Sequence, residues 1–227
     1  MMVDSTLQKS FADLSSSLPA AVGIAVAGAG GRQVSLGAWT SGVAWSTIKV
    51  PLAIAALAVD DADLVFKTIT LSDNAAAEEL WTRLGASAAG LVQAVIREAG
   101  DPTTVVESRR LRAEYTPFGQ TRWPLIDQAR FAAGLSRLPE ASRVIELMGD
   151  LSADHCWGLA AKGIAAKGGW GPEITDGYLV RQFGIVSDNV GVALAAEVGD
   201  GGYEAGVDAV NTLTDWLVER LPELTDD

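Results

Sequence analysis

The sequence predicts an α+β fold, in which an antiparallel sheet of about five strands carries an all-helical insertion. Three observations lead to this prediction. Two apolar segments precede a long run of helical pattern and three follow it, covering residues 21–27, 33–38, 164–170, 178–186 and 190–198. Helical patterns also lie near both ends of the chain, and amphipathic helices at these ends would cover one face of the sheet.

The amino-terminal elements are a helix and a hairpin. Residues 7–18 carry apolar side chains at helical spacing, and Pro19 ends this helix. The strands at 21–27 and 33–38 are joined by a turn at residues 29–32 that contains two glycines. The sequence therefore predicts a β-hairpin near the start of the chain.

Helical patterns joined by short polar breaks occupy residues 39–154. One helix begins near Ser46, and the others cover residues 75–84, 88–99, 125–138 and 141–148. Residues 103–124 form an irregular connection with several arginines. We therefore expect two domains: residues 1–38 with 155–227 build the sheet, and residues 39–154 are a reduced helical domain inserted between its second and third strands.

The chain after the insertion returns to strands. Turns at Gly171-Pro172 and at Ser187-Asp188-Asn189 separate the three predicted strands. Residues 203–221 form a final amphipathic helix. This helix and the one at 7–18 are the two that we expect on the sheet.

Composition excludes several classes of function. The 227 residues are 48% hydrophobic and 20% charged, as in globular proteins, and the net charge of −12 argues against binding nucleic acid or an anionic membrane through a basic surface. The chain has one cysteine, Cys156, and one histidine, His155, so an internal disulfide, a cysteine-based zinc cluster and a multi-histidine metal site are excluded. We expect no metal and no cofactor. Acidic residues at positions 60, 61 and 63 interrupt the longest candidate for a membrane span.

The amino terminus lacks the basic and apolar regions of a signal peptide. The protein is cytoplasmic if this chain is complete, and exported if the chain is a trimmed mature domain. The sequence does not choose between these compartments, and it does not indicate an oligomeric state.

Ser46 and Lys49 are the first candidate catalytic residues. Their spacing places a hydroxyl and an amine one turn apart on one face of a helix whose following residues are almost all apolar. A serine needs a neighbouring base to become a nucleophile, and an amine in apolar surroundings loses its proton more easily. The alternative is that Ser46 caps the helix and Lys49 points to water.

Two further motifs follow this pair, and together they carry a resemblance. Ser72-Asp73-Asn74 begins a helix, and Lys167-Gly168-Gly169 lies on the first strand after the insertion. The order Ser-x-x-Lys, Ser-Asp-Asn, Lys-x-Gly resembles the penicillin-recognising serine hydrolases, which include class A β-lactamases and penicillin-binding D,D-peptidases. The segments 72–85 and 121–124 are also similar to this family, so the resemblance covers most of the chain.

The residue types suit acyl transfer. Ser46 would attack a carbonyl carbon while Lys49, or Ser72 relaying to it, takes the proton. Asn74 would hydrogen-bond Lys49 and a substrate amide, and Lys167 would place positive potential against a substrate carboxylate and favour a neutral Lys49. The resemblance implies an oxyanion hole made by the backbone N–H groups of Ser46 and Trp170. Gly169 and Arg181 are further candidates for substrate binding.

Three departures from the family pattern are visible. Ser46 and Ser72 are only 26 residues apart, which indicates a reduced helical domain. Gly168 stands where the family usually has threonine or serine, so a hydroxyl that helps to bind a substrate carboxylate is missing. The deacylating glutamate of class A enzymes has no clear counterpart, because Glu114 lies in a short loop with mismatched spacing and reads more readily as a solvated charge.

Several motif residues also have plain structural interpretations. Ser-Asp-Asn occurs again at 187–189, where it suits a hairpin turn, and the first copy could serve only as a helix N-cap. Lys167 and Arg181 could face solvent, and His155 reads as structural. Four tryptophans near the motifs could form a cavity wall or fill the core; they are Trp39, Trp45, Trp157 and Trp170.

These observations lead to one preferred function and two alternatives. The preferred function is a serine hydrolase that acts through acyl-Ser46 on a β-lactam or related amide, with slow deacylation. The first alternative is a D,D-peptidase or esterase of the same fold. The second is a binding protein of this fold with little catalysis, which the glycine at 168 favours. The expected partner is a small-molecule or peptide-like substrate.

Overall fold

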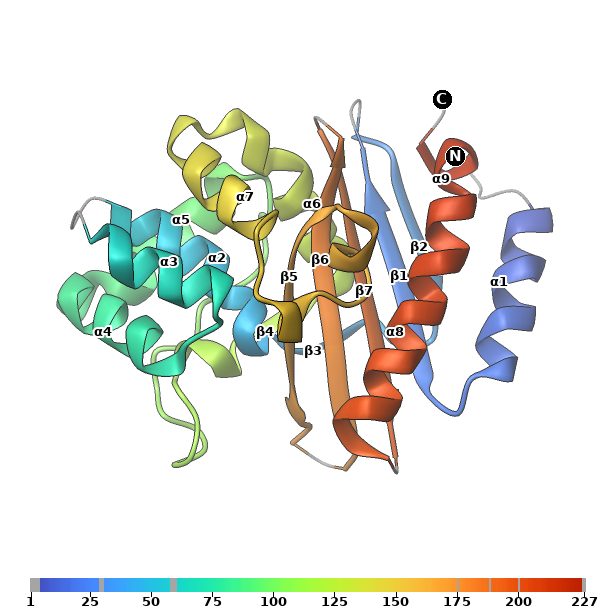
Figure 1. Cartoon of the computed structure of the whole chain (residues 1–227), viewed down its shortest axis with the longest axis horizontal. Helices are drawn as coiled ribbons and strands as arrows, with labels where there is room; N and C mark the ends of the chain where they lie inside the picture. Colours follow the sequence, from blue (N-terminus) through green and yellow to red (C-terminus); the bar gives the residue numbers. More distant parts are fainter. Residues whose placement is uncertain are drawn as a thin grey trace.

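A five-stranded antiparallel sheet forms the centre of the protein in a computed structural model, which describes residues 5–28, 31–57, 61–174, 176–187, 189–199 and 201–225. The strand order is β2-β1-β7-β6-β5 (Figure 1). The strands are β1 (Ala21–Ala27), β2 (Gln33–Gly37), β5 (Ala165–Pro172), β6 (Tyr178–Ser187) and β7 (Val190–Val198). The predicted α+β fold with about five antiparallel strands is confirmed.

Burial along the strands follows their place in the sheet. In β1, the six residues from Val22 to Ala27 are all buried, because α6 packs on one face of this strand and side chains of the two terminal helices share a buried cluster with its other face. In the edge strand β2, buried and exposed residues alternate. The other edge strand, β5, does not alternate, because η2 and α7 pack against it.

Helices pack on both faces of the sheet. On one face lie α1 (Ser5–Ser17), α8 (Gly202–Glu219) and the short α9 (Leu221–Thr225), and α8 contacts β6 and β7 (Figure 1). On the other face, α6 (Leu125–Gly134) packs on β7 and β1. The contact is close at Gly191, where an added Cβ would stand 2.3 Å from the carbonyl oxygen of Ala129. The expected cover of one face by the terminal helices is confirmed.

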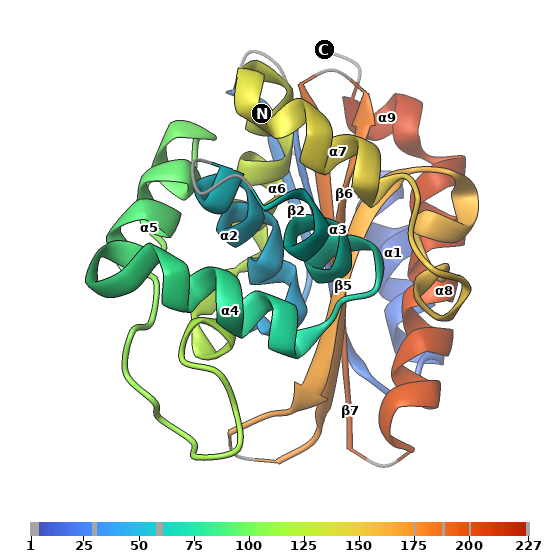
Figure 2. The same ribbon diagram turned by 60° about the vertical axis from the view of Figure 1, so that its left-hand side comes forward.

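The remaining helices lie beyond α6 and beside the edge strand β5 (Figure 2). They are α2 (Lys49–Ala56), α3 (Ala62–Thr70), α4 (Asn74–Leu84), α5 (Ala88–Glu98) and α7 (Ser142–Met148). A short 3-10 helix, η2 (Trp45–Ile48), leads directly into α2 and contacts β5. The division into two domains stays a prediction, and α6 of the predicted helical insertion packs directly on the sheet.

Four elements differ from the prediction. Helix α3 was not among the predicted helices. Asp61 caps it by accepting a hydrogen bond from the Leu64 N–H, and its buried Val65 and Ile69 belong to the core that it shares with the neighbouring helices. A two-stranded sheet pairs β3 (Ser41–Val43) with β4 (Arg122–Pro124), inside segments that carry no alternating pattern. Strand β5 continues through Pro172, so the turn predicted at Gly171-Pro172 begins later. Ala29, Gly30 and Asp188 of the other predicted turns lie outside the described residues.

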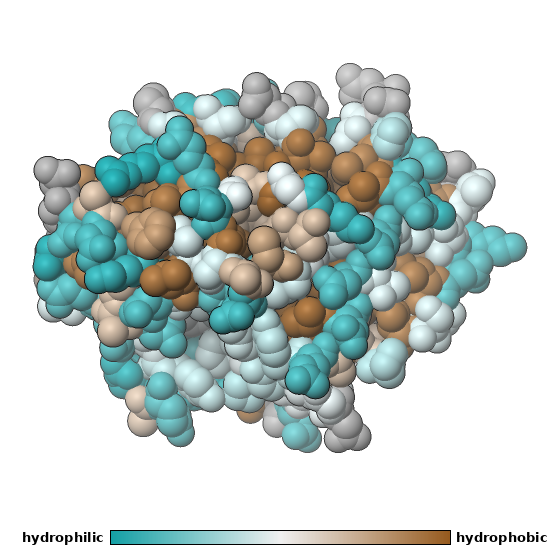
Figure 3. All heavy atoms as spheres, in the orientation of Figure 1, coloured by the Kyte–Doolittle hydropathy of each residue, from teal (hydrophilic) through white to brown (hydrophobic). Residues whose placement is uncertain are grey.

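The surface combines hydrophilic and apolar areas. On the face shown in Figure 3, apolar side chains gather in the upper middle, over α7 and the neighbouring ends of the strands, and hydrophilic side chains dominate at both sides. In the part of the chain that the structure describes, no helix has both the length and the apolar character needed to cross a membrane.

Candidate active site

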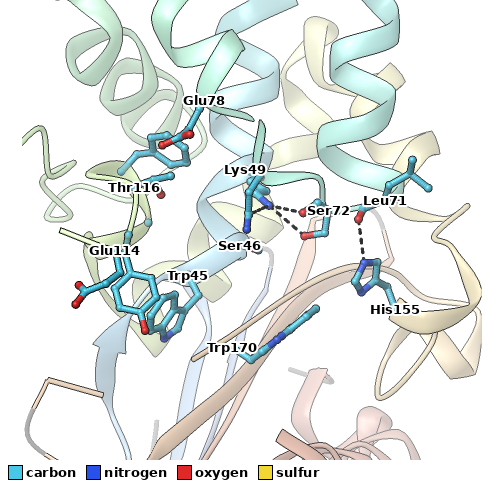
Figure 4. A pocket seen from close by; sticks show the side chains of 14 residues that line it. Trp45, Ser46, Lys49, Leu71, Ser72, Glu78, Glu114, Thr116, His155 and Trp170 are labelled. Carbon is cyan, nitrogen blue, oxygen red and sulfur yellow. Dashed lines mark hydrogen bonds between the residues drawn. The ribbon is translucent and has the colours of Figure 1, made fainter. Parts of the chain in front are cut away.

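One cavity of about 320 Å³ collects most of the predicted site residues. It lies between η2 and α2, the loop before α4, and the edge strand β5 (Figure 4). The predicted residues that line it are Ser46, Lys49, Ser72, Asn74, Glu114 and Trp170. The fold thus brings the first two sequence motifs to one side of β5, which carries the third.

Lys49 is buried and tightly held. Its side chain is 2% exposed, and its Nζ donates hydrogen bonds to the backbone oxygen of Ser72 at 2.5 Å and to Asn74 Oδ1 at 2.7 Å. The Ser72 Oγ is farther away, at 3.4 Å. Burial lowers the pKa of Lys49 from 10.5 to about 7, although the negative charge of Asp73 opposes this shift. The alternative in which Lys49 points to water is wrong.

Lys167 contacts Ser72 as well, through the serine hydroxyl. It is 1% exposed, and its Nζ donates to Ser72 Oγ at 2.8 Å and to the Gly168 carbonyl oxygen at 3.1 Å. Burial, and then the positive charge of Lys49, hold the pKa of Lys167 well below its usual value. The alternative in which Lys167 is an exposed strand lysine is therefore wrong. Lys167 reaches the cavity through the Ser72 hydroxyl.

The backbone around the site adopts unusual conformations. Trp45 and Ser72 both have φ of 51°, a region that non-glycine residues seldom occupy and that recurs at functional sites. The alternative in which Ser46 caps the helix is wrong, because Ala44 and Ile48 occupy the N-cap positions of η2 and α2 and neither helix has a side-chain cap. Ser46 instead lines the cavity, beside Lys49 (Figure 4).

Strand β5 packs directly on the backbone of η2. A Cβ on Gly169 would stand 2.7 Å from the Ser46 nitrogen and 2.9 Å from the Thr47 nitrogen. A side chain at this position would therefore push β5 away from the Ser46 nitrogen, which is predicted to belong to an oxyanion hole. This geometry gives Gly169 a role in spacing the two elements.

The neighbouring Gly168 faces a different constraint. A Cβ on Gly168 would lie 2.6 Å from the Trp157 ring, so the indole fills the space that a threonine or serine side chain would need. Trp157 is buried and does not line the cavity, whereas Trp170 lines it and Trp45 both lines it and belongs to the core. The four tryptophans thus divide between the two expected roles, and Trp39 is in the core, where its Nε1 donates to Glu197.

His155 lies closer to the site than the sequence indicated. It lines the cavity, and its ring centroid is 5.4 Å from that of Trp170. Its Nε2 is 3.1 Å from the Leu71 carbonyl oxygen, which only accepts hydrogen bonds, so this nitrogen carries the proton. Burial lowers the pKa of His155, which keeps the ring neutral near pH 7. No sequence motif distinguishes this histidine from a structural one.

Arg112 and Glu78 were also missed. The Arg112 guanidinium lies 5.0 Å from the Trp45 ring centroid and 4.6 Å from that of Tyr115, and it donates to the Pro172 carbonyl oxygen at 2.9 Å. It therefore joins the arginine-rich loop to the end of β5 and lies against Trp45 and Tyr115, which line the cavity. Arg112 has no sequence feature that separates it from nearby arginines. Glu78 lines the cavity four residues after Asn74, and this helical spacing was a usable signal.

Arg181 does not reach the cavity, and its predicted role in substrate binding is wrong. The side chain is fully buried, and its Nη1 donates to the carbonyl oxygens of Gly42 and Val43 at 3.1 Å each. Its Nη2 donates to Trp123 O at 3.0 Å and Gln128 Oε1 at 2.8 Å. These four acceptors hold the guanidinium inside the core, where it connects β6 to the β3–β4 sheet. Burial lowers its pKa to about 9, so the side chain stays charged at neutral pH.

Replacing Arg181 with alanine is expected to lower the free energy of unfolding by about 3 kcal/mol, because several buried carbonyl groups lose their donor. Denaturant unfolding of both proteins measures this loss. The exposed Arg143 on α7 provides a matched control, and Arg143→Ala should change the free energy by less than about 0.5 kcal/mol. Equal effects of the two substitutions would show that the buried contacts of Arg181 add nothing to stability.

Glu114 lines the cavity from its outer edge. Its side chain is exposed, and in Figure 4 its carboxylate points away from Ser46 and Lys49. The structure thus agrees with the interpretation of Glu114 as a solvated loop charge. Its possible role in deacylation stays a prediction.

Comparisons with known proteins identify the fold. No protein-family model matches this chain, and no curated protein matches it. Among solved structures, the β-lactamase from Streptosporangium roseum matches with a TM-score of 0.72 and 15% sequence identity, over 97% of this chain and 100% of that chain. The chain has the fold of the penicillin-recognising serine hydrolases.

Two further structures with this fold are of different kinds. PBP-A matches with a TM-score of 0.70 and 20% identity, over 96% of this chain and 97% of that chain. The ancestral class A β-lactamase GNCA matches with a TM-score of 0.67 and 21% identity, over 94% of this chain and 99% of that chain. The predicted resemblance is therefore confirmed at the level of the fold.

Proposed function

We propose that this protein is a serine hydrolase that transfers an acyl group through an acyl-Ser46 intermediate, with a β-lactam or a related amide as substrate. The observation that carries the proposal is the environment of Lys49 beside Ser46. Its two short hydrogen bonds go to the Ser72 backbone oxygen and Asn74 Oδ1, which are acceptors only. A neutral amine has two N–H groups to satisfy both, and its lone pair remains available for a hydroxyl proton.

The acylation step follows from these contacts. Ser46 Oγ attacks the substrate carbonyl carbon and its proton passes to Lys49 Nζ, forming a tetrahedral oxyanion that the N–H groups of Ser46 and Trp170 would bind. The carbon–nitrogen bond then breaks, and the leaving nitrogen receives a proton. Ser72 can relay this proton from Lys49, because its hydroxyl is 3.4 Å from Lys49 Nζ and accepts a hydrogen bond from Lys167.

Hydrolysis of the acyl-Ser46 ester needs a base for water, and neither carboxylate of the cavity is well suited. The Glu114 carboxylate points away from Ser46 (Figure 4). Glu78 forms an ion pair with Arg110 at 3.5 Å, so its carboxylate is engaged with the arginine-rich loop. The acyl-enzyme should therefore be long-lived.

Intact-mass measurement after mixing the protein with benzylpenicillin tests the proposal. A β-lactam opens without losing atoms, so we expect one adduct with the full mass of the penicillin. The lifetime of this adduct should exceed the time that it takes to form by about a hundredfold or more. A chromogenic cephalosporin should show little turnover. Rapid, saturable hydrolysis that disappears in Glu114→Gln would contradict slow deacylation, and Glu79→Gln is the matched control because Glu79 does not line the cavity.

Two outcomes would favour the alternatives. An adduct with a fluorophosphonate but none with the penicillin would favour an esterase or a peptidase that does not accept β-lactams. Reversible penicillin binding without any adduct would favour a binding protein, an alternative supported by the missing hydroxyl at Gly168 and the Trp157 ring that fills its place.

A further inference from the structure

The charged side chains around the cavity at Ser46 indicate which substrates it accepts. Two carboxylates, Glu78 from α4 and Glu114 from the arginine-rich loop, line this cavity (Figure 4). Every lysine and arginine of the chain lies within the described residues, and Lys49 is the only one of them that lines the cavity. The charge that a substrate meets there is therefore that of two carboxylates and one lysine.

Lys49 cannot hold a substrate carboxylate and act as the base at the same time. Its Nζ already donates to the Ser72 backbone oxygen at 2.5 Å and to Asn74 Oδ1 at 2.7 Å. A carboxylate bound against this amine would favour its charged form and so remove the lone pair that accepts the Ser46 proton. Acylation therefore needs a substrate that leaves Lys49 neutral.

The cations nearest to the cavity lie behind its wall and are held by the protein itself. Lys167 is 1% exposed and donates to Ser72 Oγ at 2.8 Å. Arg110 pairs with Glu78 at 3.5 Å, and Arg112 donates to a backbone oxygen of β5 at 2.9 Å while it lies against a tryptophan ring of the wall. None of these three cations lines the cavity. A carboxylate that entered would lose its hydrogen bonds to water, and the described lining residues offer it no cation other than the base.

The remaining walls suit an uncharged group. Burial lowers the pKa of His155, so this lining residue is neutral near pH 7. Aromatic rings form much of the cavity surface, and they belong to Trp45, Tyr115, Phe118 and Trp170. A neutral group of the substrate can pack on these rings without a counter-ion.

We propose that the part of the substrate inside this cavity carries no carboxylate, and that Ser46 accepts acyl groups from neutral amides or esters in preference to their carboxylate-bearing counterparts. This inference rests on the proposed acyl transfer at Ser46 and narrows its substrate class. A penicillin then reacts slowly because of its carboxylate, and esterification of that group should make it react faster.

Benzylpenicillin and its methyl ester form a matched pair of probes for the full chain. They share the β-lactam and differ only at the carboxylate, and each adds its full mass to Ser46 when the lactam carbon–nitrogen bond opens. Intact-mass time courses give the second-order rate constant of acylation for each probe. We expect the ester to react at least about tenfold faster in the wild type, because the acid brings one charged group that finds no partner.

Reversal of one charge on the cavity wall tests the cause of this preference. Glu114 is exposed, so Glu114→Lys should keep the fold, and circular dichroism verifies this. The new cation should raise the rate with the acid by about threefold or more and leave the rate with the ester within about twofold of the wild type. Glu79→Lys makes the same change of charge on α4 outside the cavity and should keep the wild-type preference.

Equal rates for the two probes in the wild type, or a faster reaction of the acid, overturn the proposal. Equal narrowing of the preference in Glu79→Lys and Glu114→Lys overturns it too, since the effect is then one of net charge. If a fluorophosphonate labels Ser46 but neither β-lactam does, the two β-lactams are compared as inhibitors of that labelling, and the proposal stands only if the ester inhibits more strongly. Failure of the acyl-transfer proposal itself looks different, because Ser46 is then labelled by none of the three reagents.

Discussion

Substituting Ser46 with alanine is expected to abolish covalent labelling by both a penicillin and a fluorophosphonate, while the wild type gains one adduct per chain. The Ser46 side chain lines the cavity beside a lysine whose pKa is about 7. Loss of the hydroxyl removes the attacking atom itself, so the expected effect is complete rather than partial. Peptide mapping of the wild-type adduct should place the added mass on Ser46.

Two other serines separate this role from general damage to the protein. Ser87 is exposed before α5, has no capping hydrogen bond and lies outside the cavity, so Ser87→Ala should label like the wild type. Ser72→Ala should keep the site of labelling at Ser46 but slow it, because the proton relay is lost. An adduct that persists in Ser46→Ala, with unchanged thermal unfolding, would assign the nucleophile to another residue.

The sheet and the motifs could be predicted because local sequence determines them. Apolar runs of strand length led to β1 and β7 with the observed bounds, and the three motifs fall on elements that the fold brings together. The short β3 and β4 were not predictable in this way. Three residues carry too little periodicity, and their pairing depends on residues about 80 positions apart.

The walls of the cavity depend on tertiary contacts that have no local signature. Arg112 and Arg181 illustrate this limit from opposite directions. Arg112, in a loop with several charged residues, stacks on Trp45 beside Ser46. Arg181, on the strand paired with β5, points into the core because backbone oxygens of a distant two-stranded sheet accept its hydrogen bonds. The position of Arg181 on a strand next to β5 therefore led to the prediction that it reaches the site. Tertiary packing instead directs its side chain into the core.

Replacing Lys49 with methionine is expected to slow acylation of Ser46 by about a hundredfold, the usual loss when a general base is removed. Methionine keeps most of the buried volume and removes only the amine. In the wild type, the acylation rate should rise with pH through about 7 and level off above about pH 8, because only neutral Lys49 has the lone pair that accepts the Ser46 proton. Stopped-flow acylation between pH 5.5 and 9 measures both effects.

The pH dependence of the free energy of unfolding gives an independent measure of the lowered pKa of Lys49. The pKa of Lys49 is about 7 in the folded protein and about 10.5 in the unfolded chain, so between these values the unfolded state binds more protons. The free energy of unfolding should therefore rise with pH across this window, by up to about 1.4 kcal/mol per pH unit from Lys49. Lys49→Met should lose this part of the rise, while the buried Lys167 continues to contribute its own.

Lys9, which is exposed on α1, is the matched control for both measurements. Lys9→Met should leave the acylation rate, its pH profile and the slope of stability with pH close to those of the wild type. An acylation rate in Lys49→Met within a few-fold of the wild type would exclude Lys49 as the base. If Lys49→Met kept a normal acylation rate but its stability rose less steeply with pH than that of the wild type, Lys49 would be a buried neutral lysine without a catalytic role. Lys167, acting through Ser72, would then be the next group to test.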